Sequence, residues 1–333
     1  MDKVYADTVR LLLQVAPDVF ANDVFAMKGG TAINLFVRDM PRLSVDIDVV
    51  YTPWQTPREQ ALAGIANELD AVAVRLGKLS LSTRKVRTKD PGDTKLLIEN
   101  AQCQVKVEVN VVFRGTVLPT ERRALTPRTA AMFSAEMNLP VLAAAELYGS
   151  KLVAAMDRQH PRDLFDVWQM FESDGLSDAA LECFVTYLAG HNRPTHEVLF
   201  GSEKDITGEY QNNFVGMTTE PVSLDTLLST RARLRTELQQ RLTNDHRKFL
   251  SGLARAHPDW ALLKCAHAAE LPALRWKLAN LHTFQKRRPD DFERQASALD
   301  ERLCSRRRCG PDSLANQPEP GRPRRGATVS CTQ

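Results

Sequence analysis

The sequence has few cysteines and no long apolar run. Its six cysteines form no CxxC pair and have no histidine pattern beside them, which argues against a zinc site or a disulfide framework. No apolar stretch approaches the roughly 20 residues that cross a bilayer. Met1-Asp2-Lys3 does not begin like a signal peptide. We therefore expect a cytoplasmic protein with no membrane partner.

A large excess of one charge is also absent. The 44 Lys and Arg residues nearly balance the 41 Asp and Glu residues, and the formal net charge is +3. From Glu301 onward there are seven basic and three acidic residues, so the rest of the chain carries about −1. Most of the chain is therefore not a strongly basic nucleic-acid-binding surface. Residues 300–333 are rich in Arg and Pro and lack aromatic residues, which predicts a disordered basic tail.

The hydrophobic pattern changes along the chain. Residues 1–125 mix helical and alternating periods, and the expected elements are helices at 4–16 and 58–76 and strands at 24–27, 44–51, 79–86, 95–99 and 104–113. Beyond Pro140 the period is helical, first over 141–158 and then over 162–172. We expect an α+β protein with a mixed sheet and flanking helices over 1–125, an all-helical domain over 140–299 and the tail over 300–333.

Two carboxylates stand on one face of the strand expected at 44–51. Side chains alternate along a strand, so Asp46 and Asp48 point to one face and the Val and Ile residues between them point to the other. Like charges this close repel each other unless a cation lies between them. Carboxylate oxygens are ligands that Mg²⁺ prefers. The pair therefore predicts a Mg²⁺ site.

The run Lys28-Gly29-Gly30-Thr31-Ala32 predicts a phosphate-binding turn before that strand. Glycines let the backbone approach oxygen atoms closely, and the start of a helix leaves free N–H groups for a phosphate. Thr31 can cap a helix that extends to about Phe36 and can add a hydroxyl bond to the phosphate. The run lacks the Gly-Lys-Ser/Thr ending of a P-loop, which disfavours a Walker-type NTPase.

Glu108 is the candidate third metal ligand. In the strand expected at 104–113, the Val residues alternate with polar ones, so Glu108 lies on the polar face. If this strand lies beside Asp46, three carboxylates converge. The alternative is an exposed strand residue that pairs with Lys106 or with a nearby Arg.

A third group of charged residues comes from the helical half. Lys151 lies among apolar residues of the helix expected at 141–158, and Asp163 and Asp166 share one face of the next helix. Lys151 can contact a triphosphate, with Asp166 as an orienting partner or base. The alternatives are a lysine whose ammonium group reaches the surface and an acidic pair that faces the helix dipole.

These runs resemble the AbiEii/AbiGii (MenT-like) toxin family of the DNA polymerase β-like nucleotidyltransferase superfamily. The matching runs fall in the family order over residues 20–290: Lys28-Gly-Gly-Thr-Ala-Ile-Asn-Leu, Arg42-Leu-Ser-Val-Asp-Ile-Asp-Val-Val-Tyr51, Val107-Glu-Val-Asn110 with Arg114-Gly115, and Lys151 followed by Arg162-Asp-Leu-Phe-Asp166. The resemblance implies a nucleotidyltransferase catalytic domain with a helical C-terminal domain.

The resemblance also assigns roles by position. It implies that Gly30 and Thr31 form the family's Gly-Ser/Thr element, next to Gly29, and that Asp46 and Asp48 bind metal. Lys151 matches the nucleotide-contacting lysine, and Asp166 matches the last Asp of an Asp-x-x-Asp motif. Glu108 as a third ligand rests on superfamily analogy. Thr31 stands where many members have serine, which keeps the hydroxyl.

The implied activity is that of the toxin of a bacterial toxin–antitoxin or abortive-infection system. Such an enzyme uses an NTP and Mg²⁺ to add a nucleotide to the 3′ end of tRNA, and a cognate antitoxin is a possible partner. Two alternatives stay open: modification of a protein or small-molecule hydroxyl, and a non-catalytic nucleotide- or antitoxin-binding protein. The basic residues that are candidates for the RNA backbone, or else for a solvated surface, are Arg84, Lys85, Arg87, Lys89, Arg122, Arg123 and Arg128.

Overall fold

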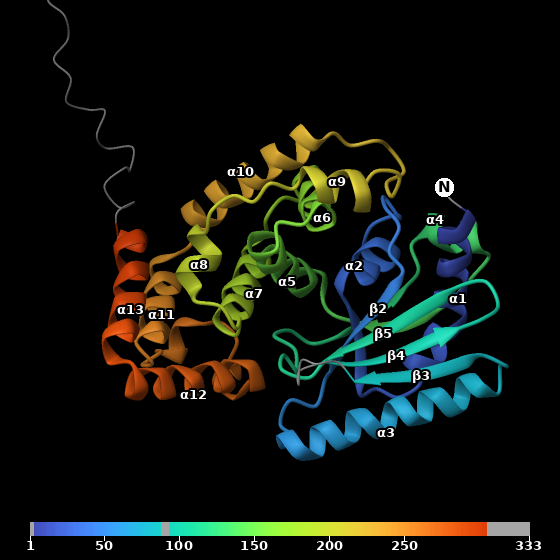
Figure 1. Ribbon diagram of the computed structural model, residues 1–333, viewed down its shortest axis with the longest axis horizontal. Helices are drawn as coiled ribbons and strands as arrows, with labels where there is room; N and C mark the ends of the chain where they lie inside the picture. The colour runs from blue at the N-terminus through green and yellow to red at the C-terminus, as the bar shows by residue number, and fades with distance from the viewer. Residues whose placement is uncertain (1–2, 88–92, 305–333) are drawn as a thin grey trace, which may run out of the picture.

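The computed structural model describes residues 3–87 and 93–304 of the chain (Figure 1). Lys89 and most of the expected basic tail therefore lie outside the described residues. Within these ranges, no helix is both long and apolar enough to span a membrane.

In the described ranges, seven strands form one mixed sheet, on the right of Figure 1. The strands are β1 (Phe25–Lys28), β2 (Asp46–Tyr51), β3 (Ser82–Arg87), β4 (Asp93–Glu99), β5 (Gln104–Asn110), β6 (Glu121–Ala124) and β7 (Asn138–Val141). Their order across the sheet is β3-β4-β5-β2-β1-β7-β6. β2 runs parallel to β5, and β1 runs parallel to β7, while the other neighbouring pairs are antiparallel.

Helices α1 (Lys3–Val19) and α3 (Arg58–Gly77) pack against each other and against the sheet. In α3, the buried side chains recur every three or four residues, at Ile65, Leu69, Val72 and Leu76, as the sequence pattern predicts. The short helix α2 (Gly29–Ala32) follows β1 and continues as the π-helix η1 (Ile33–Val37), and α4 (Pro127–Phe133) lies between β6 and β7.

The C-terminal half is helical. Its elements are α5 (Ala144–Asp157), α6 (Pro161–Phe171), α7 (Asp178–Ala189), α8 (Thr195–Phe200), α9 (Thr207–Asn213), α10 (Leu224–Arg241), α11 (Asn244–Ala254), the 3₁₀ turns η2 (Trp260–Leu262) and η3 (Ala268–Glu270), α12 (Pro272–Arg287) and α13 (Pro289–Cys304). The helix α5 packs against α6 and α7. The helices α11 and α13 lie at the end of the molecule far from the sheet, and α12 extends from there towards α3 (Figure 1).

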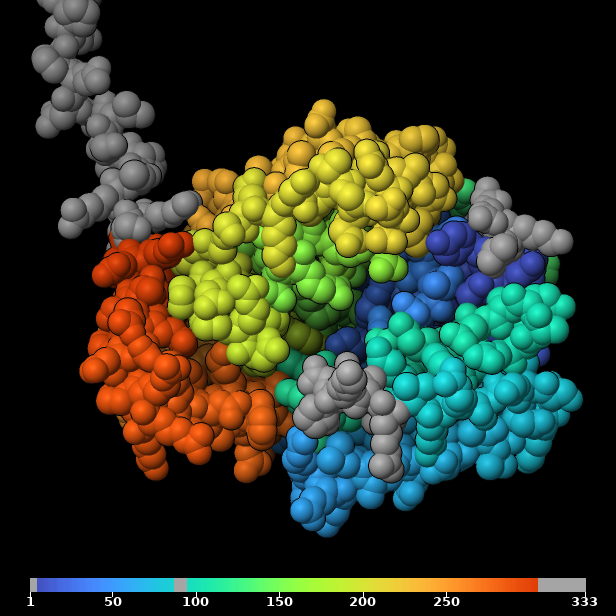
Figure 2. Space-filling model, in the orientation of Figure 1, coloured from blue at the N-terminus to red at the C-terminus, as the bar shows by residue number. Residues whose placement is uncertain are grey.

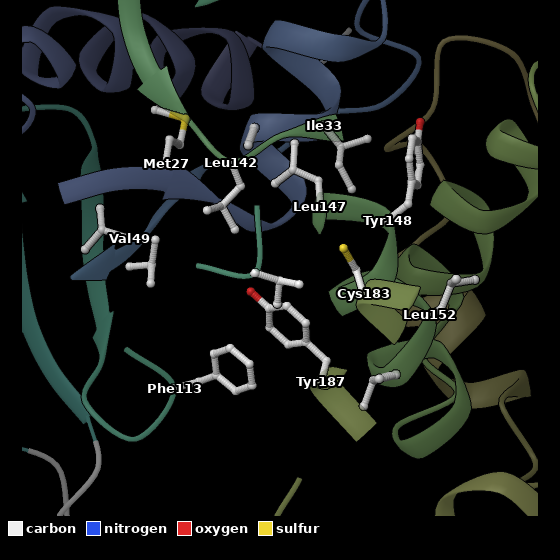
Figure 3. Close-up of a cluster of buried hydrophobic side chains, with 14 of the residues drawn as sticks. Met27, Ile33, Val49, Phe113, Leu142, Leu147, Tyr148, Leu152, Cys183 and Tyr187 are labelled. Atoms are coloured by element: carbon white, nitrogen blue, oxygen red, sulfur yellow. The ribbon is translucent and has the colours of Figure 1, made fainter. Parts of the chain in front are cut away.

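One apolar core runs through both halves. Figure 3 shows Met27 and Val49 from the sheet in one buried apolar cluster with Leu147 of α5 and Tyr187 of α7. The rings of Phe113 and Tyr187 stack with their centroids 4.0 Å apart. This continuous packing holds the helical half against the sheet, so that the surfaces between them form a defined site.

The predicted α+β fold is confirmed, and several element ends differ. The strand expected to end at 113 ends at Asn110, because the Asn110 side chain accepts hydrogen bonds from the N–H groups of Val112 and Phe113 and turns the chain. The helix expected from 141 begins at Ala144, since Val141 belongs to β7. The helix α13 extends to Cys304, past the expected tail start at 300. The division into domains 1–125 and 140–299 stays a prediction.

Candidate active site

The sheet brings the three predicted carboxylates onto neighbouring strands. In the parallel pair β2–β5, Asp46 lies opposite Lys106 and Asp48 lies opposite Glu108. Residues opposite each other in a ladder point to the same face of the sheet. Ile47 and Val49 are fully buried, as the alternation predicts, while Asp46 and Asp48 are only partly covered. The polar face of β2 and β5 thus carries acidic and basic side chains side by side.

Asp48 lies directly against the turn after β1. Lys28 is its partner in the antiparallel β1–β2 register. Gly29 has a φ of +76°, and a Cβ atom there would overlap the Asp48 carboxylate. Burial raises the pKa of Asp48, and the neighbouring carboxylates of Glu108 and Asp46 add to this effect, while Lys28 opposes it. A further positive charge beside Asp48 would therefore be favourable.

Glu108 is held by two lysines. Its carboxylate lies 2.8 Å from the ammonium nitrogen of Lys95 and 2.7 Å from that of Lys106. Burial alone would raise the Glu108 pKa, but the hydrogen bonds and charges of these lysines lower it. Lys106 also lies 3.5 Å from Asp46. The pairing that the sequence offered as the alternative for Glu108 is therefore present.

The described residues contain no group of three or more His, Cys, Asp or Glu side chains arranged as a ready metal site. Asp46 and Asp48 nevertheless fit a hard cation such as Mg²⁺, since both offer carboxylate oxygens on one face of β2 and the neighbouring carboxylates help to raise the pKa of Asp48. Two lysines already form ion pairs with the Glu108 carboxylate. The role of Glu108 as a third metal ligand stays a prediction.

The expected cap at Thr31 is wrong. The helix begins at Gly29, two residues earlier, and has no side-chain cap. Thr31 is fully buried, its hydroxyl donates to the backbone oxygen of Asp46, and the hydroxyl oxygens of Thr31 and Ser44 lie 2.9 Å apart, within hydrogen-bond distance. Thr31 thus fixes the start of β2, and with it the position of Asp46, relative to the glycine turn.

Asp166 is the centre of a buried ion-pair network. The Arg42 guanidinium donates to both carboxylate oxygens, at 2.7 and 2.6 Å. Lys151 lies 3.0 Å from Asp166 and 2.9 Å from Asp163, and Asn34 Nδ2 donates to Asp166 at 3.3 Å. All four charged side chains are buried, and the most exposed of them, Lys151, is only 7% exposed. The network ties the chain before β2 to α5 and α6.

These charges set the protonation of the network. Burial alone would raise the pKa of Asp166, but Arg42 and Lys151 lower it. Burial alone would lower the pKa of Lys151, but Asp163 and Asp166 raise it. Arg42 and Lys151 thus favour the charged form of Asp166, and its role as an orienting partner or as a base stays a prediction. Lys151 stays charged and fixed.

A cleft of about 790 Å³ lies between the two halves. Lys28, Gly29, Gly30 and Asp48 line it from the sheet side, and Ser150, Lys151, Arg158, Lys277 and others line it from the helices. Figure 2 shows the surface recessed between the green residues of the helical half and the blue-green residues of the sheet. Its described lining includes five Lys or Arg side chains and two carboxylates, so the cleft favours anionic ligands.

The profile of the family described as "Nucleotidyl transferase AbiEii toxin, Type IV TA system" matches residues 10–280 of the sequence. The chain belongs to this family. It is therefore a nucleotidyltransferase toxin of a type IV toxin–antitoxin system, and the resemblance drawn from the sequence is confirmed. No curated relative matches the sequence.

The fold of this AbiEii-family chain is also found in a solved structure. It is similar to MenT4, a nucleotidyltransferase toxin from Mycobacterium tuberculosis H37Rv, with a TM-score of 0.55 and 20% sequence identity. The match covers 84% of this chain and 94% of MenT4. The shared architecture therefore extends over most of this chain.

Several residues in the cleft lining or buried beside it in the AbiEii-family chain were not assigned a role from the sequence. Arg42 lies in the quoted run before Asp46, but its partner Asp166 is 124 positions away, and no local pattern connects them. Tyr187 donates to Glu146 at 2.9 Å, and its ring lies 5.8 Å from the ammonium nitrogen of Lys28. Of these residues, only Lys28 had a recognisable place in a sequence motif that predicts a binding site, because it directly precedes the glycine pair.

The basic residues that the sequence offered as contacts for the RNA backbone lie far apart in the structure. Arg84 and Lys85 lie on β3 at one edge of the sheet, whereas Arg122 and Arg123 lie on β6 at the other edge. Lys85 also pairs with Asp70, and Arg123 pairs with Glu121 at 2.6 Å. These residues do not form one basic patch. A strand-edge surface built from all of them is therefore not the favoured RNA-binding site.

The ion-pair network predicts acid sensitivity. Burial alone would raise the pKa of Asp163, but Lys151 and Arg158 lower it from 3.8 to about 2. A carboxylate whose pKa is lower in the folded protein than in the unfolded chain stabilises the fold at pH values above its unfolded-state pKa. This stabilisation is lost as the pH falls from about 4 to about 2. We expect a loss of about 2 kcal/mol of unfolding free energy from this group, measured by urea unfolding across that range. Asp163→Asn should give a shallower pH dependence, and equal slopes in the two proteins would contradict the assignment.

Proposed function

We propose that this chain transfers a nucleoside monophosphate from an NTP to the 3′ hydroxyl of a tRNA and releases pyrophosphate. The single observation that carries the proposal is the cleft, which brings Asp48, the glycine turn and the fixed charge of Lys151 to one surface. Family membership supplies the reaction class. The tRNA acceptor, the Mg²⁺ dependence and the roles of individual residues are our inferences.

The triphosphate is placed by the basic lining. Lys28 and Lys151 approach the cleft from opposite walls, with Arg158 beside Lys151. Lys151 is held in place by Asp163 and Asp166, so little side-chain freedom is lost when it binds a phosphate. The backbone at Gly29 and Gly30 can approach phosphate oxygens closely, since neither residue has a Cβ atom.

Asp46 and Asp48 would hold the metal. Mg²⁺, when bound, neutralises triphosphate charge and stabilises the pyrophosphate that leaves. The chain's own part is to keep both carboxylates on one face of β2, which Thr31 and the β2–β5 pairing achieve. Lys106 balances the charge of Asp46 and Glu108 at the rim of the site.

Substitution of Gly29 tests the close approach at the glycine turn. We expect Gly29→Ala to reduce transfer about 100-fold, because the new methyl group would push the Asp48 carboxylate out of position and the positive φ would be strained. Initial rates of transfer from a labelled NTP measure the effect.

Gly77→Ala is the matched control for this change. A Cβ atom at Gly77, the last residue of α3, meets no described heavy atom within 4 Å. The Gly77→Ala enzyme should therefore be as active as the wild type. An active Gly29→Ala enzyme would show that the turn does not need to approach Asp48 so closely.

The acceptor is tested directly. The protein is incubated with Mg²⁺, each α-labelled NTP, total tRNA and a cell lysate, and the labelled fraction is identified. Label on tRNA supports the proposal, and label on protein or on a small molecule supports the alternative hydroxyl acceptors. Bound nucleotide without any transfer would indicate a binding protein instead.

A further inference from the structure

One face of α12 forms a wall of the cleft. Trp276, Asn280 and Phe284 follow one another at four-residue spacing, and Lys277 and Leu281 form the adjacent row. Residues spaced in this way lie on the same side of a helix. All five line the cleft that also contains Gly29 and Asp48. This wall is assembled from an aromatic pair, an amide, an ammonium group and an aliphatic side chain.

Trp276 is unusually exposed for its size. Its side chain is 53% exposed, although large aromatic residues are normally well covered. The Arg58 guanidinium carbon lies 5.7 Å from the ring centroid. Arg58 is the first residue of α3, on the sheet side of the cleft, so the contact joins the two walls at one edge. Arg58 and Trp276 thus mark one border of the cleft, and the exposed indole surface is available to a flat ligand.

Lys277 gives the same wall a positive charge in a covered position. Its ammonium group donates to the backbone oxygens of His191 and Arg193, at 2.9 and 2.8 Å, and its side chain is 8% exposed. Burial lowers its pKa to about 8. These two hydrogen bonds hold the Lys277 side chain in one orientation, so this part of the wall is an ordered surface.

We propose that the α12 wall (Trp276, Lys277, Asn280, Leu281 and Phe284) binds the nucleobase of the incoming NTP. This inference rests on the proposed function, which places the triphosphate at Gly29, Gly30 and Lys151. A cleft of about 790 Å³ has room for a whole nucleotide, and the α12 wall is the part of its lining with exposed aromatic surface.

The chemistry of the wall suits a base. Aromatic faces stack on any nucleobase, so Trp276 would give affinity with little preference among bases. The Asn280 amide both donates and accepts hydrogen bonds, as the edges of bases do. Asn280 is exposed in the described structure and lies one turn from Trp276. It is therefore the residue that we expect to select among the four NTPs.

The test separates base binding from phosphate binding. Calorimetry without any acceptor RNA measures the affinity for each NTP and for inorganic tripolyphosphate. We expect Trp276→Ala to weaken NTP binding about tenfold and to leave tripolyphosphate binding unchanged. Trp276→Phe should keep most of the affinity, because it keeps an aromatic face. Asn280→Asp, which replaces the amide donor with an acceptor, should change the ranking of the NTPs.

Thr283→Ala is the control, since Thr283 is an exposed residue of α12 outside the cleft lining. Its NTP affinity should match that of the wild type. Unchanged NTP binding in Trp276→Ala would overturn the assignment. A Trp276→Ala enzyme whose transfer kinetics show a raised KM for tRNA alone would also overturn it, since the wall would then bind the acceptor. Equal losses for NTP and tripolyphosphate would also overturn it. If the wild type binds no NTP at all, the proposed function itself fails.

Discussion

Asp48→Asn is expected to reduce nucleotide transfer by between about 100-fold and 1,000-fold while the fold is retained. The substitution keeps the shape of the side chain and removes the charge that lies against Gly29 and opposite Glu108. Because the Asp48 carboxylate is poorly solvated, loss of its charge should leave the melting temperature unchanged or slightly higher. Initial rates at saturating NTP, together with thermal unfolding, measure both effects.

Lys106→Met is the matched comparison for Asp48→Asn. Lys106 lies on the same polar face and pairs with Asp46 and Glu108, so its removal changes the charge of the site without removing a predicted metal ligand. We expect less than a tenfold change in rate. An Asp48→Asn enzyme within tenfold of the wild type would show that Asp48 is not part of the reacting centre.

Asp166→Ala is expected to lower the unfolding free energy by about 3–5 kcal/mol. The change leaves the Arg42 guanidinium, which is 3% exposed, without its bidentate partner, and removes one of the two carboxylates that hold Lys151. A buried charge without its partner cannot be solvated, which explains the size of the loss. Urea unfolding measures it.

A double variant separates a positioning role from a catalytic one. Arg42→Met with Asp166→Leu removes both buried charges and should recover most of the lost stability. Lys151 keeps Asp163, so we expect a raised KM for NTP and a kcat within about tenfold of the wild type. A stable double variant with no measurable kcat would instead indicate that Asp166 acts on the reacting atoms.

The alternation of β2 could be predicted from sequence because it depends on neighbouring residues alone. Asp46 and Asp48 share a face, and Ile47 and Val49 are buried, as the pattern requires. The helix α3 followed its apolar spacing in the same way. Local periodicity was thus sufficient to predict α3 and the strand that carries Asp46 and Asp48.

The strands β6 and β7 were not expected. Each has four residues, and β7 contains Pro140, which disfavours a strand in a sequence pattern. Pairing with β1 and β6 stabilises β7 nonetheless, and such pairing is not visible from short runs. The π-helix Ile33–Val37 after α2 was missed because its pattern resembles that of an ordinary helix.

The network around Asp166 depends on contacts far apart in sequence. The sequence indicated Lys151 and the two aspartates from their positions on two expected helices, and the resemblance supported Lys151 and Asp166. The charge that neutralises Asp166 most directly is that of Arg42, from the chain before β2. The same limit applies to the cleft wall, where Trp276 meets Arg58 across more than half of the chain. Only the folded arrangement combines these residues into one site.

Transfer of a nucleotide to the 3′ hydroxyl of tRNA is tested most directly by one measurement. The enzyme is incubated with Mg²⁺ and either α-labelled or γ-labelled NTP, on intact tRNA and on tRNA whose 3′-terminal ribose has been oxidised by periodate. We predict label on intact tRNA from the α-labelled NTP alone, and none on the oxidised tRNA. Label from the γ-labelled NTP, or equal labelling of oxidised tRNA, would contradict the account.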